Sequence, residues 1–231
     1  SMLPQLNDHH VFLFNRERLF KSGDVLRADT GTFSLPLVVS RYLKGATSPW
    51  KGHVTAGWLR DSVAYLHLRD FDDADTLSRV MDLELRRFGS AKAVVIDLRN
   101  NTGGGDFAVQ MMASRFADRR RLYQISRIRI GPGANDFEAP RYWTIRPRGT
   151  VWRGRVVVLT NRHTMSAAEV LITALRDRPD VVVVGERTAG VFADIFTDTL
   201  PNGWQFAVPY TDHRTCFGTS LEGEGHAPDI R

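Results

Sequence analysis

Two periods of hydrophobic and polar positions alternate along this chain, and each period predicts a different kind of element. Short apolar runs predict strands at 63–68, 93–98, 156–159 and 181–184. Apolar side chains that recur every three or four residues predict amphipathic helices over 75–88, 107–116 and 166–175. The alternation of strands and helices favours an α/β fold with a mixed, mainly parallel sheet and crossover helices.

Three further segments add detail to this α/β pattern. Pro201, Asn202 and Gly203 predict a hairpin turn between strands at 195–200 and 204–208. Residues 123–152 have a mixed pattern of strand and loop. The run of four valines at 181–184 is too apolar for a half-exposed strand, so we expect it to be buried on both faces. The first sixty residues are less regular.

Composition is compatible with one compact domain. A chain of 231 residues with 42% hydrophobic side chains can bury a sizeable core. No stretch approaches the roughly 20 apolar residues that a membrane span needs, so we expect no integral membrane segment. The single cysteine, Cys216, excludes an internal disulfide and a cysteine metal cluster.

The formal net charge of +5 does not by itself indicate a nucleic-acid partner. The basic residues are scattered along the chain, apart from one run of arginines at 119–121. Cations are favourable near the C-terminus of a helix, so we interpret this run as a solvated helix end. Nucleic-acid binding is therefore not expected.

The stretch T-M-S-A-A-E at 164–169 is the first candidate for chemistry. It follows the predicted strand at 156–159 and opens the predicted helix, so the unpaired N–H groups of the helix start surround Ser166. A serine in this position is well placed to be a nucleophile. It is also a common helix N-cap, and this stretch alone does not decide between the two.

A second candidate turn follows the predicted strand at 93–98, where residues 97–105 read D-L-R-N-N-T-G-G-G. Glycines at such a turn let the backbone approach a ligand and aim N–H groups at it; the alternative is a tight strand-to-helix turn without a ligand. Gly103, Gly105 and Ala108 also fit the G-x-G-x-x-A pattern of dinucleotide-binding folds. The acidic residue that this pattern requires about 20 positions later is missing near Tyr123, which argues against a nucleotide cofactor.

Together the motifs resemble those of the S41 peptidases, the family of tail-specific and C-terminal processing proteases and of the tricorn core proteases. The family pattern runs D-L-R-x-N-x-G-G, T-x-S-A-x-E, G-E-x-T-x-G and E-G-x-G-x-x-P-D. This chain has matching segments, in the same order, at 97–104, 164–169, 185–190 and 222–229. The resemblance implies a core with the spiral fold of ClpP and crotonase, and Ser166 as the nucleophile. It also implies an oxyanion hole made by the N–H groups of Ala167 and of Gly104, with Gly103 as the rival to Gly104.

The general base departs from the commonest version of the family. Many S41 enzymes use a serine–lysine dyad, but Val191 occupies the lysine position here and cannot accept a proton. The tricorn-like branch uses a Ser-His-Glu arrangement, with its histidine in an N-terminal D-x-H segment. That segment matches Asp8, His9 and His10, so the resemblance implies His10 as the base and Glu222 as its orienting acid. His9, His163 and, for the acid, Glu224 remain the alternatives.

We therefore expect a serine peptidase that hydrolyses polypeptides through an acyl-enzyme, without metal or cofactor. There is no H-E-x-x-H zinc motif and no G-x-S-x-G elbow. The alternative is a non-catalytic binding module on the same scaffold, as in the interphotoreceptor retinoid-binding proteins. We expect residues 1–57 to contribute His10 to a core at 58–231 within one compact unit, with no PDZ domain evident. The resemblance also suggests an exported bacterial protein; the oligomeric state is not indicated.

Overall fold

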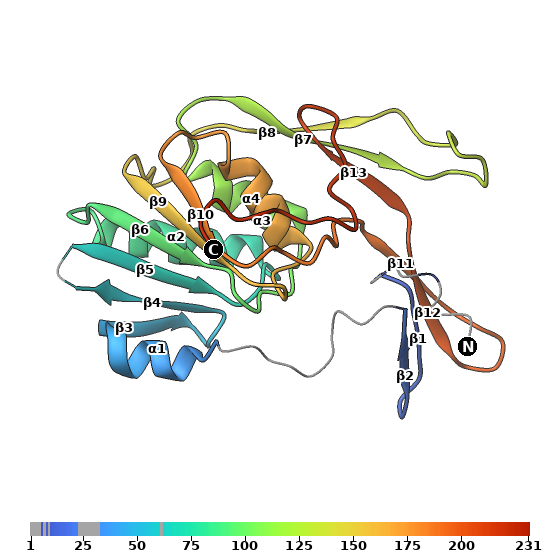
Figure 1. Cartoon of the computed structure of the whole chain (residues 1–231), viewed down its shortest axis with the longest axis horizontal. Helices are drawn as coiled ribbons and strands as arrows, with labels where there is room; N and C mark the ends of the chain where they lie inside the picture. The colour runs from blue at the N-terminus through green and yellow to red at the C-terminus, as the bar shows by residue number, and fades with distance from the viewer. Residues whose placement is uncertain (1–5, 7, 9, 23–32, 61) are drawn as a thin grey trace.

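The computed structural model describes residues 6, 8, 10–22, 33–60 and 62–231. Its centre is a six-stranded sheet (Figure 1), whose strands lie in the order β10 (Val181–Gly185), β9 (Arg155–Thr160), β6 (Ala93–Asp97), β5 (Val63–Leu68), β4 (Val54–Leu59) and β3 (Leu43–Trp50). Strands β10, β9, β6 and β5 pair in parallel, and β4 and β3 continue the sheet in antiparallel pairing. The α/β class and the mixed, mainly parallel sheet are as expected from the sequence.

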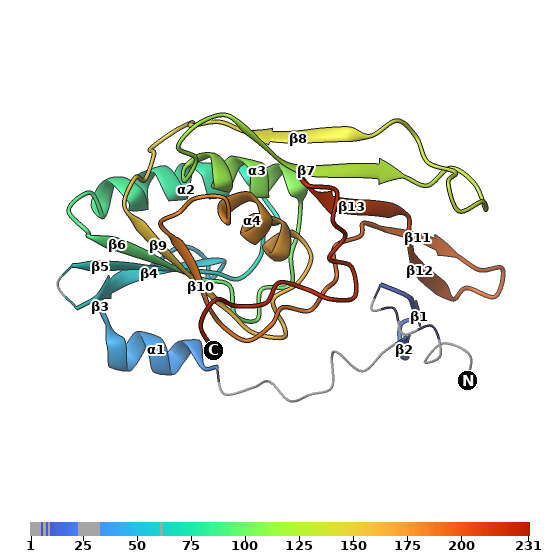
Figure 2. The same ribbon diagram turned by 45° about the horizontal axis from the view of Figure 1, so that its top comes forward.

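Helices cover this sheet on both sides. Figure 2 shows α2 (Ala74–Arg87) and α3 (Asp106–Ser114) above the sheet and α1 (Leu35–Tyr42) below it. The third long apolar pattern forms α4 (Ala167–Leu175), which packs against α3. In α2 the apolar stripe is buried, as its period predicts, and Asp73 caps the helix by accepting hydrogen bonds from the amides of Asp75 and Thr76.

Two smaller sheets extend from the core. The first has the order β13 (Thr211–Thr215), β7 (Arg121–Ile128) and β8 (Arg141–Ile145). The second has the order β11 (Ile195–Thr199), β12 (Gln205–Pro209), β1 (Phe12–Phe14) and β2 (Leu19–Lys21), so the N-terminal hairpin lies beside a hairpin from the C-terminal part of the chain (Figure 1). The predicted hairpin at 201–203 is confirmed, because β11 and β12 pair antiparallel across it.

Two expectations from the sequence are wrong. The valines of β10 are not buried on both faces: Val181 and Val183 are buried, whereas Val182 and Val184 are half-buried. The reason is that β10 is an edge strand of the sheet. The arginine run at 119–121 is not a solvated helix end, because α3 ends at Ser114 and Arg121 is the first residue of β7, with its side chain paired to Asp118.

The expected division at residue 57 falls within β4. Residues 43–57 belong to the six-stranded sheet. His10 instead belongs to the segment 10–22, whose strands β1 and β2 lie in another sheet. Within the described part of the chain, each helix is too short or too polar to traverse a lipid bilayer.

Candidate active site

Hydrogen bonds hold the two candidate turns against each other at the carboxyl ends of β6 and β9. The hydroxyl of Thr164 donates to the carbonyl of Leu98 at 2.8 Å, and the amide of Met165 donates to the carbonyl of Asn101 at 3.0 Å. The amide of Asn100 donates to Oδ1 of Asn161 at 3.0 Å. Because neighbouring parallel strands end at the same edge, turns 61 residues apart in sequence become one rigid unit.

Ser166 lies at the start of α4 in a strained backbone conformation. Its φ of 55° and ψ of −127° lie outside the regions that L-residues commonly adopt. Such strain persists only where the surroundings over-determine it, and it concentrates at functional sites. One restraint is the Ser166 amide, which donates to the carboxylate of Glu169 at 3.2 Å.

Glu169 is fully buried and connects this turn to the segment 188–191 through hydrogen bonds. Its carboxylate accepts hydrogen bonds from the Thr188 hydroxyl at 2.5 Å and from the amides of Gly190 and Val191, both at 2.8 Å. Burial raises the pKa of Glu169 to about 7, and these donors oppose that shift by stabilising the carboxylate. Glu169 is not among the site residues expected from the sequence. Its position three residues after a helix-opening serine, the spacing of a capping box, is the signal that could have found it.

The glycine turn lies directly against Ser166. A Cβ added at Gly103 would meet Cβ of Ser166 at 2.6 Å and the amide nitrogen of Ala167 at 3.1 Å. The Gly103 amide already donates to Oδ1 of Asn101 at 2.8 Å. The amides of Gly104 and Ala167, in contrast, have no hydrogen-bond acceptor among the described residues. Of the two rival glycines, Gly104 is thus the one whose N–H is free to meet a ligand.

His10 is buried at the N-terminal end of the hairpin segment and faces the C-terminal acidic motif. Its Nδ1 lies 3.4 Å from Oε1 of Glu222 and 3.6 Å from Oδ1 of Asp8. The other oxygen of Glu222 accepts hydrogen bonds from the amides of Phe192 and Ala193, each at 3.0 Å. These two amides fix the carboxylate of Glu222, which in turn faces one side of the imidazole ring. Neither ring nitrogen of His10 has a hydrogen-bond partner among the described residues.

One cavity brings these side chains together. It has a volume of about 680 Å³, and its lining residues include His10, Gly104, Ser166, Val191 and Asp194. Apolar side chains complete the wall, contributed by Phe12, Leu19, Met165 and Ile195. The candidate nucleophile, base and oxyanion donor, which come from three distant parts of the sequence, therefore face the same space. Val191, at the family's lysine position, is buried there and offers no titratable group.

The remaining candidates lie elsewhere or outside the described residues. His9 is one of the residues that the structure does not describe. Glu224 has an exposed side chain, and His163 is not among the residues that line the cavity. His226 is buried, with Nε2 at 3.1 Å from the carbonyl of Glu169 and 3.0 Å from the hydroxyl of Thr173, so it stabilises the packing behind Ser166.

Comparisons with known proteins identify relatives of this chain in sequence and in structure. The chain is 30% identical over 176 residues to the chloroplastic C-terminal processing peptidase of Tetradesmus obliquus. The matched region covers 76% of this chain and 36% of the relative. It spans little more than a third of the length of the curated relatives it matches.

Among solved structures, a candidate peptidase from Parabacteroides merdae superposes with a TM-score of 0.83 and 25% identity, covering 99% of this chain and 72% of that one. The photosystem II D1 C-terminal processing protease gives a TM-score of 0.60 at 25% identity, covering 73% of this chain and 42% of that chain. The sequence profile of peptidase family S41 matches residues 62–231, and the chain belongs to this family.

Proposed function

We propose that this chain hydrolyses peptide bonds of polypeptides as a serine peptidase, with Ser166 as nucleophile, His10 as general base and Glu222 as the acid that orients it. The observation that carries the proposal is the shared cavity, in which His10, Gly104 and Ser166 meet from separate elements. The relatives named as C-terminal processing peptidases make a polypeptide the expected substrate class.

The chemistry follows from the orientation of His10. Because Nδ1 faces Glu222 at 3.4 Å, Nε2 is the nitrogen that can serve Ser166. As Ser166 Oγ attacks the carbonyl carbon of the scissile bond, His10 takes the hydroxyl proton and then gives it to the leaving amine. Water, activated by the same histidine, hydrolyses the acyl-enzyme and regenerates the serine. Catalytic contacts of this kind are often long without substrate and tighten on binding.

The amides of Ala167 and Gly104 would bind the negative oxygen of the tetrahedral intermediate. Both N–H groups lack an acceptor among the described residues. Ala167 follows Ser166 in the chain, and Gly104 lines the same cavity. Loss of one such donor typically lowers the rate by ~10²–10³. In this scheme Glu169 acts indirectly, because it holds the Ser166 amide and the segment after Thr188 in place.

The proposal is tested with Ser166→Ala and a generic unfolded polypeptide such as casein. We expect peptide hydrolysis to fall by ~10³-fold or more, because the nucleophile is removed. The thermal midpoint should stay close to that of the wild type. Ser40→Ala is the matched control, because Ser40 lies exposed on α1; it should keep full activity. Equal activity in Ser166→Ala and wild type would remove Ser166 from the mechanism, and a folded wild type without hydrolysis would favour a non-catalytic binding module.

A further inference from the structure

A second group of titratable side chains lies beside the cavity and has no part in the proposed peptidase chemistry. It consists of Asp106 at the start of α3, Asp194 just before β11, and His213 in β13. One ligand atom of each residue lies within 4.8 Å of the other two, and Nε2 of His213 is 3.3 Å from Oδ2 of Asp194. No sequence pattern indicates this group, because its members come from three separate segments without a shared motif.

Asp106 is the member of this group that has no partner. Among the described residues, its carboxylate has neither a hydrogen-bond donor nor an ion pair, although its ligand oxygen lies within 4.8 Å of the ligand atoms of Asp194 and His213. The charges that act on the group from neighbouring elements are those of Arg141 in β8 and of Glu222. Arg141 acts only at a distance, since no contact joins it to either carboxylate in the described part of the chain.

A buried hydroxyl provides an independent indication that a ligand belongs here. Tyr123, in β7, is 1% exposed, and its hydroxyl has no hydrogen-bond partner among the described residues. After burial itself, the negative charge of nearby Asp106 is the cause that raises the pKa of this hydroxyl. A buried polar atom without a partner destabilises the folded state, and a bound ion with its water would supply the missing partner.

We propose that Asp106, Asp194 and His213 bind a divalent transition-metal ion, with Zn²⁺ or Mn²⁺ as the best fit to two carboxylates and one imidazole. Imidazole nitrogen and carboxylate oxygen are ligands that these ions prefer. The remaining coordination positions would go to water, within reach of the Tyr123 hydroxyl. This site borders the cavity of Ser166 through Asp194, but it uses none of the groups assigned to the serine chemistry.

The surroundings of His213 suit a metal-binding imidazole. Its Nδ1 lies 2.7 Å from the side-chain amide of Gln124. The nearest atom of Gln124 is its Nε2. With the amide turned over, its oxygen accepts a hydrogen bond from the Nδ1–H of His213, which leaves Nε2 of the imidazole to bind a metal. Partners of this kind fix the tautomer of metal-bound histidines. A cavity of about 380 Å³, lined by Asp194 and Arg141 among others, gives the ion a route from solvent.

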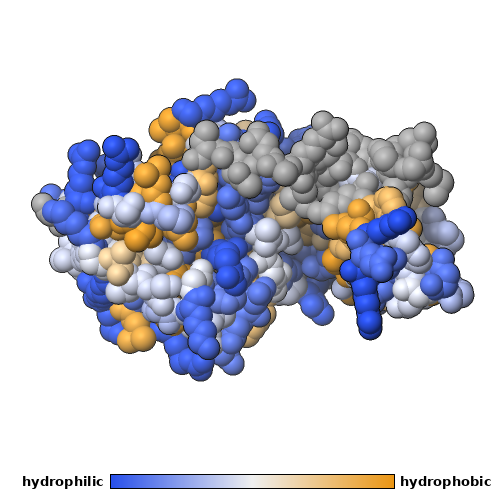
Figure 3. All heavy atoms as spheres, turned by 90° about the horizontal axis from the view of Figure 1, so that it is seen from below, coloured by the Kyte–Doolittle hydropathy of each residue, from blue (hydrophilic) through white to orange (hydrophobic). Residues whose placement is uncertain are grey.

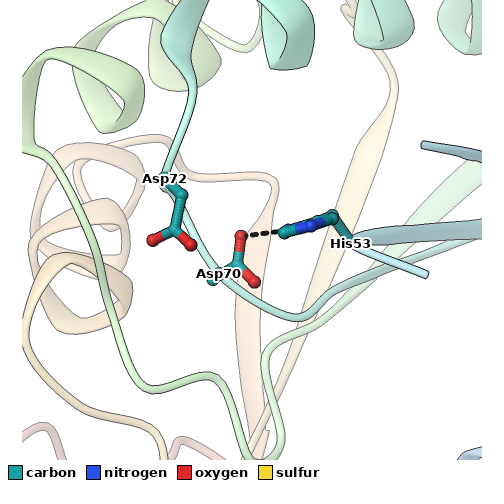
Figure 4. Close-up of side chains that lie close together, drawn as sticks. All are labelled: His53, Asp70 and Asp72. Carbon is teal, nitrogen blue, oxygen red and sulfur yellow. Dashed lines mark hydrogen bonds and ion pairs between the residues drawn. The ribbon is translucent and has the colours of Figure 1, made fainter. Parts of the chain in front are cut away.

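A comparable group elsewhere in the chain provides an internal control. His53, Asp70 and Asp72 also bring three ligand atoms within 4.8 Å of one another, and Figure 4 shows these side chains close together, with a contact between Asp70 and His53. There, however, Asp70 already accepts hydrogen bonds from His53 at 2.7 Å and from the Arg69 guanidinium at 2.8 Å. Because Arg69 occupies the place and supplies the charge that a cation would supply, we do not expect a metal at His53.

The test is direct metal binding to the whole chain after treatment with EDTA. Isothermal titration with Zn²⁺, and separately with Mn²⁺, should show one ion per chain. Asp106→Asn and His213→Gln should each weaken binding ~10-fold or more, whereas His53→Gln should bind as the wild type does. Asp106→Asn is the more informative variant, because this carboxylate has no hydrogen bond whose loss would unfold the protein, and thermal melting without metal checks this.

The proposal is overturned if the wild type binds neither ion, or if Asp106→Asn binds as tightly as the wild type. It is also overturned if His53→Gln abolishes binding while His213→Gln does not. None of these outcomes depends on peptide hydrolysis. The metal-site proposal can therefore be overturned while the peptidase proposal stands, and the peptidase proposal can be overturned while the metal-site proposal stands.

Discussion

At the scale of single residues, two carboxylates organise the candidate active site, one buried and one exposed. The buried carboxylate of Glu169 accepts four hydrogen bonds, which join the Ser166 turn to the segment 188–191. The exposed carboxylate of Glu222 accepts hydrogen bonds from two amides of the segment after Val191 and faces His10. The candidate site residues could be named from the sequence, because each lies in a motif. Their contacts could not be predicted in this way. Hydrogen bonds such as those of Glu169 join segments that are distant in the sequence, and the spacing of motifs does not show which segments lie close together in the fold.

Glu222 and Glu224 test the assignment of the orienting acid. We predict that Glu222→Gln lowers kcat by ~10–10²-fold, less than the loss in His10→Ala, because the base remains but its orientation and charge stabilisation weaken. Glu224→Gln should leave kcat unchanged, because the carboxylates paired with His10 in the described part of the chain are those of Glu222 and Asp8, not that of Glu224. Steady-state kinetics on a fluorogenic peptide measures both variants. A larger loss in Glu224→Gln than in Glu222→Gln would exchange their roles.

His226 gives a prediction about stability and pH. Burial lowers its pKa to about 4, and the nearby Arg176 guanidinium acts in the same direction. In the unfolded chain a histidine has a pKa of ~6.5, so between these values the unfolded state binds more protons. Stability from this group is therefore present above pH ~6.5 and is lost as the pH falls toward 4, by about 3 kcal/mol in total.

Urea unfolding of wild type and His226→Gln at a series of pH values isolates this contribution. The glutamine amide can still donate to the carbonyl of Glu169, so the variant should fold. We predict that the difference in unfolding free energy between wild type and variant shrinks as the pH drops from 6.5 to 4. A difference that stays constant with pH would show that His226 is not held neutral in the folded protein.

At the scale of elements, periodicity predicted the core and missed the N-terminal part. Helix α2 and strands β5, β6 and β9 were predictable because one face or run of each is buried. Helix α1 has no buried residue among those described, and β3 is mostly exposed, so neither has a clear hydrophobic period. Strands β1 and β2 have three residues each, and β1 is fixed by pairing with the distant β12.

The pairing of β1 with β12 is what carries His10 to the cavity, and Leu13→Pro tests it. Leu13 is the central residue of β1, opposite Phe206 on one side and Phe20 on the other. A proline in an inner strand removes a ladder hydrogen bond. We predict that activity falls by ~10²-fold or more. The thermal unfolding midpoint of the protein should stay close to that of the wild type, because the six-stranded sheet is unchanged. Arg16→Pro, in the turn between β1 and β2, should remain active, and equal activity in Leu13→Pro would contradict this role of β1.

At the scale of the whole molecule, the candidate site depends on both ends of the chain. His10 comes from the N-terminal segment, Gly104 and Ser166 from the core, and Glu222 from the C-terminal motif. The order of the motifs predicted this set of candidates, but the group of Asp106, Asp194 and His213 could be recognised only in the folded structure.

Exposed apolar side chains gather over α1 and around the β1–β2 hairpin on the face seen in Figure 3, and include Leu37, Tyr42, Leu19 and Phe20.

In the proposed mechanism His10 and Ser166 act as one catalytic unit, and the rate at which a fluorophosphonate probe labels Ser166 measures their coupling. Only an activated serine reacts quickly with such a probe. We predict that the wild type is labelled at Ser166, as located by peptide mass mapping, that His10→Ala is labelled ~10²-fold or more slowly, and that His163→Ala is labelled at the wild-type rate. Wild-type labelling in His10→Ala, or a folded wild type that is not labelled at Ser166, would contradict the account.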